Sequence, residues 1–192
     1  MNDETPRGRI LIVDDEEMNL EIFSTVLTAE GHTVFKARDG VEAFDKFEKV
    51  EPDLLLLDLA MPRLNGYEAC AQFRRNPKGR QIAILIATGN SELENRAEAY
   101  RVGADDFLPK PVGRLELVIR VRALLRMREY KIAAERHRAM IAAASAEVAN
   151  IAHEIEAARD ALPQPAGTPT ASHLEAALAA CRRLDQHLTP PQ

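Results

Sequence analysis

Five polar side chains of three chemical kinds come directly after apolar runs of strand length. The five are three carboxylates, a hydroxyl and an ammonium: Asp14, Asp15, Asp58, Thr88 and Lys110. If those runs are strands of one parallel sheet, the five groups gather at its carboxyl edge, where open α/β folds bind ligands. Three carboxylates at one place would repel each other, and a hard divalent cation such as Mg²⁺ would relieve that repulsion.

The chemistry that such a set could perform is phosphoryl transfer to a carboxylate. A bound Mg²⁺ would neutralise the incoming phosphate oxygens, and one carboxylate would act as nucleophile to form an acyl phosphate. The hydroxyl of Thr88 and the ammonium of Lys110 would bind the remaining oxygens. The alternative is that acidic residues at the starts of loops only cap helices. Capping could explain Asp14 or Asp15 singly, but not the charge of Asp58 at the end of a run of four leucines.

The elements that would position these groups alternate between strand and helix. Residues 54–57 form a continuous apolar run, as in a central parallel strand that is covered on both faces. We expect strands at residues 9–13, 33–37, 54–57, 82–87 and 105–108, and helices at 16–29, 41–50, 66–75, 92–102 and from about 113 onward. Five such units predict an α/β fold, a doubly wound five-stranded parallel sheet with helices on both faces.

Four motifs in this part resemble those of a receiver domain of two-component response regulators. They are ILIVDDE (10–16), LLLLDLAMPRLNGYE (54–68), ILIATG (84–89) and ADDFLPKP (104–111), and the resemblance covers residues 9–126. It implies a flavodoxin-like sheet, a Mg²⁺ cofactor, and a cognate histidine kinase or phosphotransfer protein as partner.

The resemblance also implies a role for each matching residue. Asp58 matches the phosphoacceptor, and Asp14 and Asp15 match the acidic pair that positions Mg²⁺, with the backbone carbonyl of Ala60 as a further ligand. Thr88 and Lys110 match the groups that bind the phosphoryl oxygens. Thr88 and Phe107 match the two switch residues that move on activation, although Phe107 could equally be an ordinary core residue. Turnover is expected only as phosphorylation and dephosphorylation of Asp58.

The second part of the sequence predicts a long helix. Between residues 114 and 162 there is no Gly and no Pro. Apolar or small residues recur every seven positions and again three positions later, which is typical of a coiled coil or helical bundle. These residues are Met127, Ala134, Ile141, Val148, Ile155 and Leu162, with Tyr130, His137, Ala144, Ile151 and Ala158 between them.

A Pro-rich loop at residues 163–171 precedes a capping-box pattern, Ser172-x-x-Glu175, that would begin a second helix over 172–188. The expected organisation is a flexible terminus (1–8), a receiver domain (9–126), a heptad helix (127–162), the loop and the second helix. Because two helices of this size have little core, we expect this all-α hairpin to form a homodimer through residues 127–188, as a four-helix bundle.

A short segment of the long helix carries His153 and Glu154. Together with Ile155 they resemble the H-box of the dimerisation and phosphotransfer domain of sensor histidine kinases, which implies that His153 accepts a phosphoryl group and Glu154 assists it. The chain departs from that motif at Ala152, where the family usually has Ser, and after Glu156. The alternative is a surface histidine on a dimerisation helix.

Composition and charge exclude several classes of protein. No apolar run approaches the length of a membrane span, and the polar, acidic start of the chain is unlike a signal peptide, so we expect a cytoplasmic protein. Residues 114–138 carry eight basic and three acidic side chains, but no helix-turn-helix pattern follows them. We interpret these arginines as a solvated face and expect no DNA binding.

Three hypotheses remain open from the sequence. Phosphorylation of Asp58 could alter the C-terminal helices, which would then bind a downstream protein partner. Alternatively, His153 could exchange phosphoryl groups with receiver aspartates in a phosphorelay. In the third hypothesis, phosphorylation of Asp58 does not reach the C-terminal helices at all.

Overall fold

The computed structural model describes residues 7–61, 64–89, 93–161 and 176–182. The chain divides into two compact units, Met1–Lys131 and Ile132–Gln192. The predicted N-terminal segment 1–8 lies almost wholly outside the described residues, and the predicted loop 163–171 does so entirely.

The first unit is built on a five-stranded parallel sheet with the order β2-β1-β3-β4-β5. Its strands are β1 (Arg9–Val13), β2 (Thr33–Ala37), β3 (Leu54–Leu57), β4 (Ala83–Thr88) and β5 (Asp106–Pro109). The connecting helices are α1 (Glu17–Ala29), α2 (Gly40–Val50), α3 (Gly66–Arg75), the 3-10 helix η1 (Lys78–Arg80) and α4 (Leu93–Arg101), and α5 (Arg114–Ala161) follows β5. The predicted doubly wound fold is therefore confirmed.

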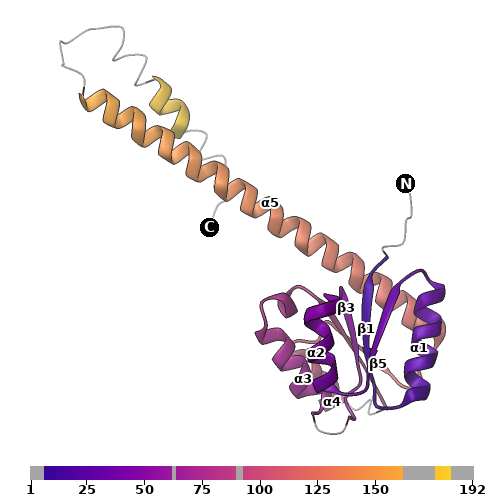
Figure 1. The fold of residues 1–192 in the computed structure, drawn as a ribbon. Coiled ribbons are helices and arrows are strands. Elements are labelled where there is room, and N and C mark those ends of the chain that lie inside the picture. The colour runs from indigo at the N-terminus through magenta and orange to yellow at the C-terminus, as the bar shows by residue number, and fades with distance from the viewer. Residues whose placement is uncertain (1–6, 62–63, 90–92, 162–175, 183–192) are drawn as a thin grey trace. The chain divides into compact units, whose positions relative to one another are not determined.

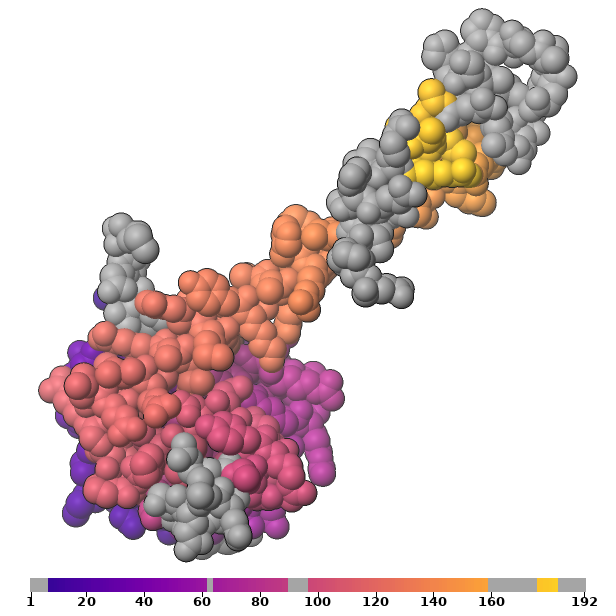
Figure 2. Space-filling model, turned by 180° about the vertical axis from the view of Figure 1, so that it is seen from behind, coloured from indigo at the N-terminus to yellow at the C-terminus, as the bar shows by residue number. Residues whose placement is uncertain are grey.

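Helices cover both faces of the sheet because alternate strand residues point to opposite sides. On one face Ile10 and Ile12 pack with α1 and with the first turns of α5, including Leu117 and Val121. On the other face Leu11 and Val13 pack with residues of α2, α3 and α4. Figure 2 shows the first turns of α5 lying across the rear surface of this unit.

Two strands lie one residue later than the sequence predicts. β4 ends at Thr88 instead of residue 87, and β5 ends at Pro109 instead of 108. The reason is that Thr88 pairs with Pro109, and the carbonyl of Thr88 accepts a hydrogen bond from the backbone N–H of Lys110 at 2.9 Å. The sheet therefore continues to the last residue before the lysine. The 3-10 helix η1 was not expected from the sequence.

The long helix α5 runs without interruption for 48 residues. The second unit contains the later part of α5 and a helix at residues 176–182, where Leu178 is buried. Arg182 on that helix forms a 2.7 Å ion pair with Glu156 of α5. The rest of the predicted second helix, at 172–175 and 183–188, lies outside the described residues. Among the helices that the structure describes, none is both long and apolar enough to cross a membrane.

Candidate functional site

Three carboxylates meet at the carboxyl edge of the sheet, as the sequence predicts. Asp14 and Asp15 follow β1, and Asp58 follows β3, which is the neighbour of β1 in the sheet. One oxygen from each carboxylate lies within 4.8 Å of the others. Asp14 and Asp58 are 1% and 5% exposed, whereas Asp15 is exposed to solvent.

The backbone of both buried aspartates continues the hydrogen-bond pattern of the sheet. The N–H of Asp14 donates to Ala37 O at 3.1 Å, and that of Asp58 donates to Val13 O at 2.9 Å. Strand pairing therefore fixes where both side chains start. The side chain of Asp58 is held as well, because its Oδ2 accepts a 3.1 Å hydrogen bond from the N–H of Ala60.

Lys110 supplies the positive charge at this edge. Its Nζ lies 2.7 Å from Asp14 Oδ2 and 3.0 Å from Asp58 Oδ1, and the Lys110–Pro111 peptide bond is cis. Burial lowers the pKa of Lys110, but the hydrogen bonds to the two carboxylates outweigh it, so that the pKa is raised overall. The lysine is therefore firmly protonated between two buried acids.

Asp58 differs electrostatically from an exposed aspartate. Burial raises the pKa of its carboxyl; the Lys110 ammonium opposes this rise, and the Asp14 carboxylate adds to it. Its Oδ1 is buried and lies 3.0 Å from Lys110 Nζ, and the ammonium is its one polar partner among the described residues. Asp58 Oδ1 is therefore held by charge alone and by no backbone donor in the part of the chain that the structure describes.

This donor set fits Mg²⁺, which prefers carboxylate oxygens and retains several waters. Three carboxylates against one ammonium leave negative charge at the edge of the sheet, and the exposed Asp15 leaves one side open to solvent. Asp14, Asp15 and Asp58 could hold the ion. The N–H of Ala60 is engaged with Asp58, and a ligand role for the Ala60 carbonyl stays a prediction.

The two predicted switch residues lie on the neighbouring strands. Thr88 is the last residue of β4, and Phe107 is on β5; both are 2% exposed. Phe107 belongs to the core cluster that also contains Ile86, Ala99 and Ala104. Its core position is therefore established, while its role as a switch stays a prediction.

His153 and Glu154 belong to the second unit. Both lie on α5 with exposed side chains, and within the described residues neither makes an ion pair or a hydrogen bond. Exposure agrees with the outward position that the heptad pattern gives His153. It is compatible with a phosphoryl acceptor and equally with a surface residue.

Two residues at the acidic site were missed by the sequence analysis. Asn19 on α1 donates its side-chain amide to Asp14 Oδ1 at 3.0 Å. Gly66 at the start of α3 packs so closely that a Cβ atom there would lie 2.2 Å from the backbone oxygen of Asp58. Gly66 falls within a quoted motif, but its closeness to Asp58 follows only from the fold.

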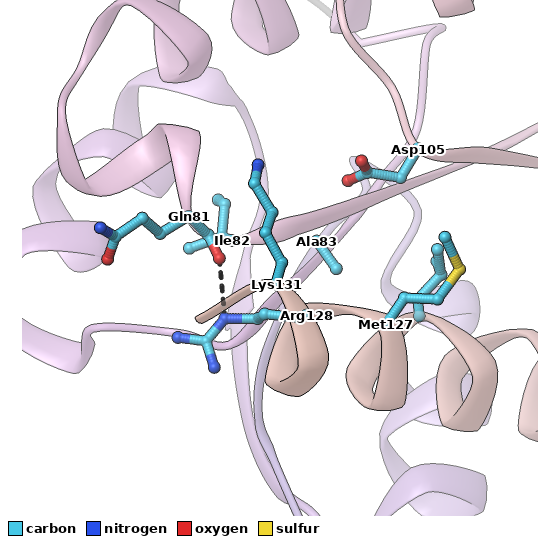
Figure 3. Close-up of a pocket in the computed structure, with 8 residues that line it drawn as sticks. Gln81, Ile82, Ala83, Asp105, Met127, Arg128 and Lys131 are labelled. Carbon is cyan, nitrogen blue, oxygen red and sulfur yellow. Dashed lines mark hydrogen bonds between the residues drawn. The ribbon is translucent and has the colours of Figure 1, made fainter. Parts of the chain in front are cut away.

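The first unit also has a small cavity at the opposite edge of the sheet, beneath α5 (Figure 3). It is lined by Gln81, Ile82, Ala83, Asp105, Leu124, Met127, Arg128 and Lys131. Arg128 Nε donates to Gln81 O at 2.9 Å, and Arg128 Nη1 pairs with Asp53 Oδ1 at 2.8 Å. These contacts hold α5 against the sheet, and the charge of Arg128 is already balanced. We therefore assign the chemistry to the acidic edge.

Comparison with known proteins agrees with this assignment. Residues 10–122 match the family model described as response regulator receiver domain. The chain is 43% identical over 127 residues to the response regulator MprA of Mycobacterium tuberculosis. This alignment covers 66% of this chain and 54% of MprA. It is 44% identical over 118 residues to MprA of Mycobacterium avium, covering 62% of this chain and 51% of that protein. The chain thus spans about half the length of the curated relatives it matches.

Solved structures show the same likeness. A putative response regulator from Chloroflexus aurantiacus is 33% identical with a TM-score of 0.61, covering 63% of this chain and 99% of its own. A CheY-like response regulator receiver domain protein from Methanospirillum hungatei is 28% identical with a TM-score of 0.62, covering 66% of this chain and 99% of its own.

Proposed function

This chain belongs to the family of response regulator receiver domains, and on that premise we propose that it accepts a phosphoryl group on Asp58 with Mg²⁺. The donor would be a cognate histidine kinase or a phosphotransfer protein. The observation that carries the proposal is the meeting of three carboxylates within 4.8 Å, next to the Lys110 ammonium.

The hydrogen bonds at the site favour Asp58 as the nucleophile. Both oxygens of Asp14 accept hydrogen bonds, from Glu16 N and Asn19 Nδ2 on one side and from Lys110 Nζ on the other. Within the described ranges, the Lys110 ammonium is the one polar partner of Asp58 Oδ1. Asp14 Oδ1 accepts from two donors, so the lone pairs of Asp58 Oδ1 are less fully engaged, and this favours Asp58 as the attacking carboxylate.

In the proposed step, Asp58 Oδ1 forms a bond to phosphorus, and the bond from phosphorus to the donor's leaving atom breaks with its electron pair. The product is an acyl phosphate. Lys110 would pair with the new phosphoryl oxygens, and the Thr88 hydroxyl would donate to them. A bound Mg²⁺ would supply charge neutralisation, held by Asp14, Asp15 and Asp58.

We further propose that the output is a helical dimerisation or docking module, residues 127–188, that binds a protein partner and not DNA. In the second unit, Ile141, Val148 and Ile155 are half-buried, whereas Met140 and Ile151 are 71% and 42% exposed. A helix with an uncovered apolar stripe gains free energy by packing against another helix. A second copy of the chain, completing a four-helix bundle, would cover that stripe.

The second candidate function is a phosphorelay in which His153 exchanges phosphoryl groups with receiver aspartates. It is supported by the exposed imidazole of His153 with the Glu154 carboxylate next to it in the chain. A neutral imidazole is a competent nucleophile near pH 7.

One labelling experiment tests both candidates. A promiscuous histidine kinase with radiolabelled phosphate is incubated with wild type, Asp58→Asn, His153→Ala and, as the matched control, His137→Ala, which changes another exposed histidine of α5. Base-labile label that disappears only in Asp58→Asn supports the receiver function and contradicts the relay. Base-stable label that disappears in His153→Ala but persists in His137→Ala supports the relay. Wild type that takes up no label contradicts both.

A further inference from the structure

Asn19 connects the first turn of α1 to the acidic edge. It is the third residue of α1, and its side chain is half-buried. The Nδ2 atom donates to Asp14 Oδ1 at 3.0 Å and to Glu16 Oε2 at 3.2 Å. One amide group thus bridges two carboxylates at the start of the helix.

The bridge determines how the carboxylate of Asp14 is turned. Its Oδ1 accepts from two donors, Asn19 Nδ2 and the backbone N–H of Glu16, each at 3.0 Å. This leaves Oδ2 to face Lys110, whose Nζ lies 2.7 Å away and also approaches Asp58. The carboxylate is therefore held with one oxygen toward the helix and the other toward the centre of the site.

The residue type at this position has a specific consequence for charge. Asp14, Asp15, Glu16 and Asp58 already place four carboxylates near one another in this part of the fold. A fifth carboxylate here would add repulsion, and a lysine would bring a cation that competes with a metal for Asp14. An asparagine supplies two N–H donors and adds no charge.

We propose that Asn19 is a positioning residue of the Mg²⁺ site, which acts on the metal only through the orientation of Asp14. This inference rests on the proposed function. Orienting groups behind metal ligands contribute measurably to metal affinity. Asn19 itself does not touch the reacting atoms.

The test is a titration of the full chain with Mg²⁺ alone, followed by isothermal calorimetry or by amide resonance shifts. The variants are Asn19→Ala, Asn19→Leu, which keeps the branch at Cγ but has no polar atoms, and Met18→Ala as control, since Met18 is adjacent on α1 and 72% exposed. Asp14→Ala and the double variant Asp14→Ala/Asn19→Ala complete a double-mutant cycle. Thermal unfolding without Mg²⁺ shows that each variant is folded.

We expect Asn19→Ala and Asn19→Leu to weaken Mg²⁺ binding by about ten- to a hundred-fold, as for loss of a group that orients a metal ligand. Met18→Ala should bind as wild type, and the double variant should bind as Asp14→Ala alone. The inference is overturned if both Asn19 variants bind Mg²⁺ like Met18→Ala, or if Asn19→Ala weakens binding equally when Asp14 is absent. If wild type itself binds no Mg²⁺, the proposed function fails, and this inference fails with it.

Discussion

The ammonium nitrogen of Lys110 lies 3.0 Å from Asp58 Oδ1, although α3, η1, β4, α4 and β5 separate the two residues in the sequence. The same nitrogen lies 2.7 Å from Asp14 Oδ2. Lys110 therefore occupies the place between two buried carboxylates where added positive charge is most favourable. A metal ion at this edge would compete with the ammonium for the same oxygens.

This competition predicts the behaviour of Lys110→Met. Without Mg²⁺ the variant should lose about 3 kcal/mol in free energy of unfolding, because two buried carboxylates lose their partner. Added Mg²⁺ should stabilise the variant more than wild type, since no ammonium opposes the ion. Denaturant unfolding with and without Mg²⁺ measures both effects. Lys46→Met is the control, because Lys46 forms an exposed ion pair with Glu42. Equal stabilisation of variant and wild type by Mg²⁺ would contradict the competition.

The burial of Asp58 predicts that Asp58→Asn raises the free energy of unfolding by an amount that depends on pH. Because burial raises the pKa of this carboxyl in the folded state, the folded protein holds the proton more tightly than the unfolded chain does. Stability should therefore fall as pH rises from the ordinary pKa of an aspartate through the raised value. In Mg²⁺-free buffer, Asp58→Asn should be more stable than wild type at pH 7 by about 1 kcal/mol, and the gain should shrink as the pH is lowered. Thermal unfolding across pH measures it, and a variant that is less stable at pH 7 would refute the explanation.

The close approach of α3 to the β3–α3 loop predicts that Gly66→Ala strongly lowers both the stability of the fold and the rate of phosphorylation of Asp58. The added Cβ would lie 2.2 Å from Asp58 O and 2.7 Å from Leu59 Cα, so the backbone next to the acceptor must shift. We expect a loss of about 2–3 kcal/mol in free energy of unfolding and slower phosphorylation of Asp58. Gly113→Ala is the matched control, because a Cβ there meets no atom within 4 Å. Equal effects of the two changes on stability and rate would show that the contact is unimportant.

The exposed stripe of the second unit predicts that Ile151→Glu weakens self-association. Ile151 is 42% exposed, and a charge there would have to be buried in a helix–helix interface. We expect the dissociation constant of the dimer, measured by sedimentation equilibrium, to rise by at least about ten-fold. Ala149→Glu places the same charge at another exposed position of α5 and should leave the association unchanged. A wild-type protein that sediments as a monomer at all concentrations would contradict the proposed dimer.

The sequence predicts the sheet well because buried parallel strands are continuous apolar runs. β1, β2 and β3 begin and end where the runs do. β4 and β5 are displaced by one residue because their ends are set by mutual pairing of Thr88 and Pro109, which a single run cannot reveal. The helix α5 is predictable from the absence of Gly and Pro between residues 114 and 162.

The site is predictable only in part. Asp14, Asp58 and Lys110 were found because each follows a strand, and the topology of a parallel sheet brings such positions to one edge. Asn19 and Gly66 were not found, because their importance arises from contacts with Asp14 and Asp58 that depend on how α1 and α3 pack. The proposed cover of the exposed stripe of α5 is a second copy of the chain, and the residues of one copy do not specify that packing by themselves.

The most direct test of the central claim is to locate the phosphoryl group after reaction with a small acyl phosphate donor. Wild type and Asp58→Asn are incubated with the donor, each with Mg²⁺ and with a chelator, and the intact mass is measured before and after hydroxylamine treatment. The account predicts one hydroxylamine-sensitive phosphoryl group on wild type only when Mg²⁺ is present, and none on Asp58→Asn. Equal modification of Asp58→Asn, or full modification of wild type in the chelator, would contradict it.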